Sequence, residues 1–153
     1  MRNKIELFTD GACKGNPGLG GWGVLIINSK ILNELKGIQQ QTTNNRMELI
    51  AVIKGLKSIQ ESADIEITTD SMYVNNGINQ WIDNWKNNGW KTAAKKPVKN
   101  KDLWQELDEL VQNYSIKWIW VKGHSGHPGN ERADQLANEA IEEFQNKNNT
   151  LTI

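Results

Sequence analysis

KIELFTDGACKGNPGLGGWGVLIIN, residues 4–28, predicts how the chain begins to fold. Apolar and polar residues alternate over Lys4–Ala12, which is the pattern of a half-buried strand, and the β-branched segment GGWGVLIIN predicts a second strand. Gly18, Gly20 and Gly23 have the formal spacing of a dinucleotide-binding loop, but that loop must open a helix. Because a strand-like segment follows instead, a hairpin turn and a strand that needs close backbone approach explain the glycines better.

Outward from this hairpin, the remaining pattern predicts a third strand and then alternating helices and strands. The expected elements are a strand over Ile31–Gln41, a helix from about Asn44 capped by Thr43 or Asn44, a strand over Ala63–Asp70, a helix capped by Ser71, a helical piece carrying Trp81 and Trp85, a helix over Lys101–Gln112, a strand over Ser115–Val121 and a helix opened by Pro128. This order predicts an α/β fold with a five-stranded mixed sheet flanked by helices. We expect one domain over residues 1–145 and a flexible C-terminal tail over residues 146–153.

Composition limits the classes of function. The formal charge is zero, with 18 Lys and Arg against 18 Asp and Glu, but six lysines and no acid lie within Lys86–Lys101. This asymmetry suggests a localised anionic ligand. The single cysteine, Cys13, excludes an intramolecular disulfide and a thiolate zinc cluster. The sequence has no apolar run near 18 residues and no signal-peptide core, so we expect a soluble, cytoplasmic protein without a membrane partner.

Two aspartates end strands that we expect to be neighbours. Asp10 lies in FTDG at the end of the first strand, and Asp70 lies in TTDS at the end of the fourth. If these strands are parallel and adjacent, the two carboxylates lie about one strand spacing apart, roughly 5 Å. They repel each other unless one is protonated or a cation lies between them.

Glu48 and Asp134 lie on the apolar faces of their predicted helices, so we expect Glu48 to face the core and Asp134 to point partly inward. Each acid taken singly is equally well explained as a turn, cap or solvated residue. If all four acids converge, four carboxylates without a soft ligand form a site for a hard cation such as Mg²⁺ or Mn²⁺.

Four of the seven tryptophans lie in or beside the lysine-rich stretch: Trp81, Trp85, Trp90 and Trp104. Aromatic faces among lysines suit a nucleic-acid backbone. A small tryptophan core beneath a solvated lysine loop explains the same residues, and both readings stay open, with different tryptophans in each role.

Both histidines lie in KGHSGHPGNERAD, residues 122–134. Two histidines three residues apart do not make a structural zinc site, because no further nitrogen or sulfur ligands are at hand. His127, which precedes Pro128, is interpreted as a structural residue of the turn into the last helix.

The motifs TDGACKGNPG, NNRMELIAV, TTDSMYV, WKTAAKKPVKNKDLW and VKGHSGHPGNERADQLA occur in this order. Together they closely resemble ribonuclease H of type I in its bacterial form, over about residues 4–141. The resemblance implies a five-stranded mixed sheet flanked by helices. It also implies a monomeric endonuclease that cleaves the RNA strand of an RNA–DNA hybrid, largely independently of sequence, and leaves 5′-phosphate and 3′-hydroxyl ends.

The resemblance assigns a role to each site residue. Its catalytic acids fall on Asp10, Glu48, Asp70 and Asp134, which would hold two Mg²⁺ ions, with Mn²⁺ as a substitute and with Asp10 bridging the two. Its mobile histidine falls on His124, which we interpret as a proton carrier on a glycine-flanked loop, with a plain loop histidine as the alternative.

The substrate-binding positions of the family also have counterparts. Cys13, Asn16, Asn44 and Asn45 match the residues that contact the RNA strand in the minor groove, Thr43 and Asn100 a DNA phosphate pocket, Trp81, Trp85 and Trp104 the DNA channel, and Lys86 to Lys99 the basic protrusion. Met72 is placed beside the substrate, where some close bacterial relatives have Gln. A hybrid-binding module without catalysis would not need four inward acids, and an integrase-like enzyme would not need the Asn44–Asn45 pair or the tryptophans.

Overall fold

The computed structural model describes residues 3–151, with side chains up to residue 147. Its elements are β1 (Asn3–Gly15), β2 (Gly18–Asn28), β3 (Ile31–Thr42), α1 (Asn44–Lys57), β4 (Ala63–Thr69), α2 (Met72–Asn76), a π-helical turn (Gly77–Trp81), α3 (Ile82–Asn87), α4 (Lys101–Val111), β5 (Ser115–Trp120) and α5 (Pro128–Leu151). The strands form one sheet in the order β3-β2-β1-β4-β5. β1 is antiparallel to β2 and parallel to β4. This five-stranded mixed sheet confirms the predicted fold class.

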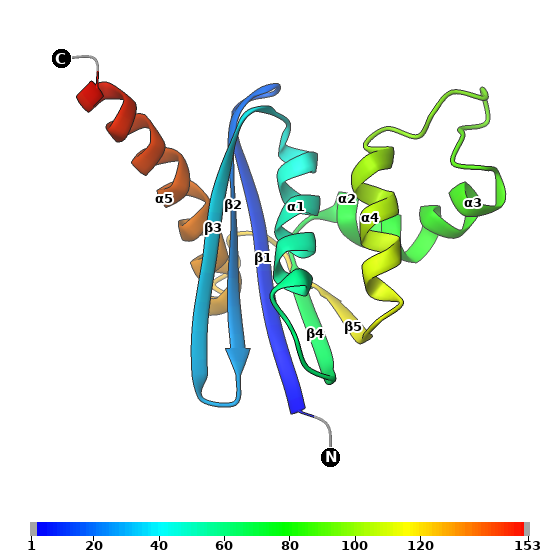
Figure 1. Ribbon diagram of the computed structural model, residues 1–153, viewed down its shortest axis with the longest axis horizontal. Helices are drawn as coiled ribbons and strands as arrows, with labels where there is room; N and C mark the ends of the chain where they lie inside the picture. Colours follow the sequence, from blue (N-terminus) through cyan, green and yellow to red (C-terminus); the bar gives the residue numbers. More distant parts are fainter. Residues whose placement is uncertain (1–2, 152–153) are drawn as a thin grey trace.

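Helices cover both faces of the sheet (Figure 1). α1, backed by α4, packs on β1 and β2 on one face, and α5 crosses β1, β2 and β3 on the other. Thr43 caps α1, since its Oγ1 accepts a hydrogen bond from the Arg46 N–H at 3.2 Å. The glycines of β2 allow α5 to approach closely: a Cβ at Gly23 would lie 2.5 Å from the carbonyl oxygen of Ala133. The predicted close backbone approach is thereby confirmed.

β1 is longer than the sequence predicted. It continues to Gly15, beyond the expected end near Ala12, because its pairing with β2 persists as far as Gly15 opposite Gly18. Its parallel pairing with β4 stops earlier, at Thr9 opposite Thr69. Asp10 therefore lies within β1, next to the point where β4 ends and Asp70 follows. The expected parallel arrangement of these two strands is confirmed.

The last helix also exceeds its predicted length. α5 continues to Leu151, whereas the sequence predicted a flexible tail from residue 146. No Gly or Pro lies between residues 146 and 151 to end the helix. Residues 152–153 lie outside the described part of the chain. Within the described residues, no helix combines the length and apolar character needed to span a membrane.

Candidate active site

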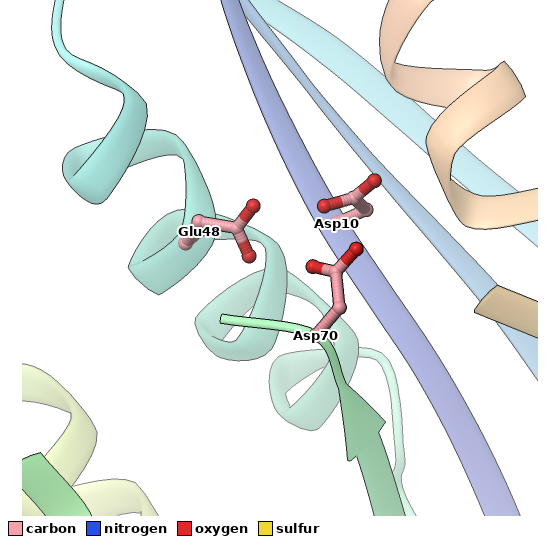
Figure 2. A group of neighbouring side chains, drawn as sticks. All are labelled: Asp10, Glu48 and Asp70. Atoms are coloured by element: carbon pink, nitrogen blue, oxygen red, sulfur yellow. The ribbon is translucent and has the colours of Figure 1, made fainter. Parts of the chain in front are cut away.

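Three carboxylates converge where β4 ends. Asp10 comes from β1, Glu48 from α1 and Asp70 from the residue that follows β4, and their side chains point toward one another (Figure 2). One carboxylate oxygen from each lies within 4.8 Å of the other two. The predicted convergence of these three acids is thus confirmed by the structure.

The pair formed by Asp10 and Glu48 is buried, and each residue is only 4 % exposed. One backbone group serves both acids: the Gly11 N–H donates to Asp10 Oδ1 and to Glu48 Oε1, each at 2.9 Å. Gly11 also lets α1 reach the strand, because a Cβ there would lie 2.6 Å from the Glu48 nitrogen. Glu48 Oε2 is buried and has no hydrogen-bond partner among the described residues.

Burial controls the protonation of this pair. It is the main cause that raises the pKa of Asp10 far above its ordinary value, and the negative charge of Glu48 adds to the effect. Burial likewise raises the pKa of Glu48 from 4.5 to about 7. Without a cation, the pair therefore retains a proton near neutral pH. Buried carboxylate oxygens, one of them unpaired, are a donor set that fits a hard divalent cation.

Asp70 is held by two residues that the sequence did not single out. Asn130 in the first turn of α5 is 2 % exposed and donates from Nδ2 to Asp70 Oδ2 at 3.3 Å. Trp120 at the end of β5 donates from Nε1 to the backbone oxygen of Asp70 at 3.2 Å. A sequence signal existed for Asn130, which stands four residues before Asp134 and therefore shares its helix face. Nothing comparable pointed to Trp120.

Asp134 lies beside the group of three acids. It is half-buried on α5, where Asn138 Nδ2 donates to its Oδ1 at 3.3 Å. Asp134 is among the acidic groups that raise the pKa of Asp10, so the two carboxyl groups are neighbours. The fourth predicted acid is therefore next to Asp10, although it is not part of the group in which Asp10, Glu48 and Asp70 lie within 4.8 Å of one another.

The two histidines occupy different environments. His124 is exposed, with φ 56°, in the loop between β5 and α5. His127 immediately precedes α5: its Nδ1 accepts a hydrogen bond from the Asn130 N–H at 3.2 Å, and its ring lies 5.5 Å from that of Phe8. The structural role predicted for His127 is confirmed, since it orders the turn that carries Asn130. The role of His124 stays a prediction.

The residues expected to contact RNA gather around the N-terminus of α1. Asn16 Oδ1, in the β1–β2 turn, accepts a hydrogen bond from the Asn44 N–H at 3.2 Å. Cys13 Sγ donates to the Thr42 carbonyl oxygen at 3.5 Å. Asn16 and Asn44 are exposed and Asn45 is half-buried. Polar groups at this end of the sheet are thus available to a ligand.

The tryptophans divide between core and surface. Trp104 is 0 % exposed and packs against Gly77. The sequence predicted that Trp104 contacts the substrate. The structure corrects this prediction, because the indole is fully buried. Trp81 and Trp85 are half-buried, with ring centroids 5.8 Å apart, and Trp85 lies 5.3 Å from Trp104. Within one aromatic cluster, Trp104 therefore belongs to the core, and Trp81 and Trp85 are partly exposed at the surface.

The other predicted contact positions are accessible. Met72, the first residue of α2, is 54 % exposed, and Lys99 is exposed in the segment before α4. Thr43 and Asn100 are both half-buried. Arg46, one turn into α1, donates to Asn100 Oδ1 at 3.2 Å and thereby connects the starts of α1 and α4.

Comparisons with known proteins agree with this geometry. The RNase H family model matches residues 2–142. A ribonuclease H of Pseudomonas putida is 61 % identical over 145 residues, which is 95 % of this chain and 98 % of that protein. One from Hydrogenovibrio crunogenus is 61 % identical over 141 residues, covering 92 % and 97 % of the two chains.

Solved structures give the same result. LC9-RNase H1, a type 1 RNase H with the type 2 active-site motif, superposes with a TM-score of 0.85 at 32 % identity, covering 94 % of this chain and 74 % of that one. LC11-RNase H1, solved in complex with an RNA/DNA hybrid, shares the fold with a TM-score of 0.72 at 23 % identity, over 92 % and 99 % of the two chains.

The mixed sheet and the acids at the end of β4 define a nuclease, an enzyme that hydrolyses phosphodiester bonds. The chain belongs to the ribonuclease H family. Enzymes of this family depend on metal ions and act on RNA–DNA hybrids.

Proposed function

We propose that this ribonuclease H hydrolyses the RNA strand of RNA–DNA hybrids with two Mg²⁺ ions, and that it leaves 5′-phosphate and 3′-hydroxyl ends. Asp10, Glu48 and Asp70 would hold the ions together with Asp134, and Mn²⁺ would substitute. The observation that carries the proposal is the buried, unpaired Glu48 Oε2 within the group of converging carboxylates. Such a buried carboxylate oxygen is costly unless the pair keeps a proton or a cation completes its coordination.

When bound, the ions would activate the attacking water and stabilise the leaving 3′-oxygen. The residues of the chain hold the acids in place for this reaction. The Gly11 N–H fixes one oxygen of Asp10 and one of Glu48, and Asn130 orients the carboxylate of Asp70. His124, on its exposed loop, would carry a proton to the leaving oxygen or assist product release.

Selectivity for RNA–DNA hybrids would come from separate contacts to the RNA strand and to the DNA strand. Only RNA offers a 2′-hydroxyl, and Asn16, Asn44 and Asn45 are polar groups at the N-terminus of α1 that could bind it. Thr43, Asn100 and Lys99 would bind a DNA phosphate, while Trp81 and Trp85 would face the deoxyribose strand. These contacts concern the backbone and sugar, so cleavage should be nearly independent of base sequence. We further propose that the enzyme acts as a monomer in the cytoplasm.

A substrate panel tests the proposal. Labelled RNA–DNA hybrid, double-stranded RNA and double-stranded DNA are each incubated with Mg²⁺ and with chelator, and the product ends are identified by mass spectrometry. The proposal requires cleavage of the hybrid alone, arrest by chelator and 5′-phosphate ends. Cleavage of double-stranded DNA at a similar rate, or of the hybrid in chelator, would contradict it.

A further inference from the structure

The hydroxyl of Tyr73, in α2, lies at the junction of α1, α2 and α4. Its Oη accepts two hydrogen bonds, one from Trp104 Nε1 at 2.9 Å and one from Asn100 Nδ2 at 3.1 Å. Its ring lies 5.8 Å from that of Trp81 and 5.4 Å from that of Trp104. The phenol thus connects the buried aromatic cluster to Asn100 at the start of α4.

Arg46 determines which way the Asn100 amide faces. Its Nη1 lies 3.2 Å from Asn100 Oδ1, and both of its terminal nitrogens are held by Asp102 at 3.0 Å and 2.8 Å. A guanidinium only donates hydrogen bonds, so the amide must turn its oxygen to Arg46. Its nitrogen therefore faces Tyr73. The indole nitrogen of Trp104 is also a donor only, so Tyr73 Oη accepts both bonds.

This arrangement leaves the proton of the Tyr73 hydroxyl without an acceptor. A phenol has one donor and two lone pairs, and here donors occupy both lone pairs. Among the hydrogen bonds of the described residues, Tyr73 Oη donates none. Lys99 and Lys101 flank Asn100 in the sequence and both are exposed, while Arg46 bonds Asn100 and is paired with Asp102. This positive stretch favours an anionic acceptor.

We propose that the Tyr73 hydroxyl is a further substrate-binding group, which donates a hydrogen bond to a phosphodiester oxygen of the DNA strand. It would act in the pocket formed by Thr43 and Asn100, so the inference rests on the proposed function. The alternative is a purely structural phenol that only accepts the bonds of Trp104 and Asn100. In both cases, removing the hydroxyl deletes the hydrogen bonds that it accepts from Trp104 and Asn100. Only a direct contact also changes substrate binding at one particular phosphate.

Tyr73→Phe tests the contact while it keeps the ring packing. Steady-state kinetics on a hybrid should show KM raised about tenfold, as expected for a lost hydrogen bond to a charged group, with kcat unchanged. The salt dependence of KM should keep its slope, because a neutral donor displaces no counterions, whereas Lys99→Ala should flatten it. Tyr114→Phe is the matched control. Its hydroxyl donates to the carbonyl oxygens of Leu56 and Ile59, so this variant should lose stability only.

Hybrids that carry a single uncharged methylphosphonate at successive positions of the DNA strand then locate the contact. In the wild type, the methylphosphonate should lower the affinity for the hybrid at the position that Tyr73 contacts. In Tyr73→Phe the same modification should cost little further affinity at that position, and at the other positions it should cost as much as in the wild type. Losses that simply add at every position, or an unchanged KM in Tyr73→Phe, would overturn the inference. A wild type that does not cleave hybrids would instead refute the proposed function.

A second experiment makes the Tyr73 hydroxyl a stronger hydrogen-bond donor and does not remove it. The chain has two tyrosines, so fluorotyrosine incorporated into the Tyr114→Phe background labels Tyr73 alone. A more acidic phenol should bind a phosphate oxygen more tightly and lower KM near neutral pH. An unchanged or raised KM would argue for the structural alternative.

Discussion

The stability of the metal-free protein should fall as the pH rises from 5 to 8. The folded state raises the pKa of Glu48 from 4.5 to about 7, mainly through burial. The folded chain therefore binds this proton more tightly than the unfolded chain does. The resulting stabilisation is complete below the unfolded pKa and is lost as the pH rises through the folded pKa. Asp10 changes stability in the same direction, because its pKa is also raised.

The expected loss follows from the shift at Glu48. A change from 4.5 to about 7 is about 2.5 pKa units, and each unit corresponds to about 1.4 kcal/mol, so the free energy of unfolding should fall by about 3 kcal/mol. Glu48 is only 4 % exposed, so solvent screening does not reduce this value much. For a domain of this size the loss corresponds to a decrease in Tm of about 10 °C.

Urea unfolding in chelator at several pH values measures this loss. Glu48→Gln should weaken the dependence between pH 5 and 8 and leave the part that Asp10 contributes, and added Mg²⁺ should restore stability to the wild type at pH 8. Glu34→Gln is the matched control, because the hydrogen bond from Arg132 lowers the pKa of Glu34 and its titration lies below this range. A free energy of unfolding that stays constant or increases from pH 5 to 8 would refute the reasoning.

Three further changes concern the residues around the acids and the protrusion. Asn130→Ala removes the hydrogen bond to Asp70 and should raise the Mg²⁺ concentration for half-maximal activity about tenfold, which a metal titration of the rate would reveal. His124→Ala should lower kcat at neutral pH on the order of 10²-fold, and an unchanged kcat would favour a plain loop histidine. Replacing Lys95, Lys96 and Lys99 with Ala should raise KM and flatten its salt dependence with little effect on kcat; an unchanged slope would argue against a substrate contact.

The sequence contained most of the fold because its signals are local. The strand-like residues after Gly23 ruled out a dinucleotide-binding helix, and Thr43 was one of two predicted caps of α1. The end of β1 was misplaced because strand length depends on pairing with a partner. β1 pairs with β2 as far as Gly15 opposite Gly18, so the strand continues past its predicted end near Ala12.

The site was predictable to the extent that side chains share a helix face or a strand end. Asp10 and Asp70 follow from parallel neighbouring strands, and Glu48 from an apolar helix face. The full burial of Trp104 could not be predicted from the same pattern, because it depends on how the π-helical turn at Gly77 packs against the indole. Contacts between elements distant in the sequence leave no periodic signal.

Hydrolysis of an RNA–DNA hybrid by Asp10→Asn, compared with the wild type in Mg²⁺, tests the central claim most directly. Asp10 is one of the three acids whose carboxylate oxygens lie within 4.8 Å of one another, and asparagine keeps its size but removes the charge that would bind a cation. We predict that Mg²⁺-dependent cleavage is abolished while circular dichroism and thermal unfolding show an intact fold. Turnover by the folded variant at a rate near that of the wild type would contradict the assignment of these acids as the catalytic metal site.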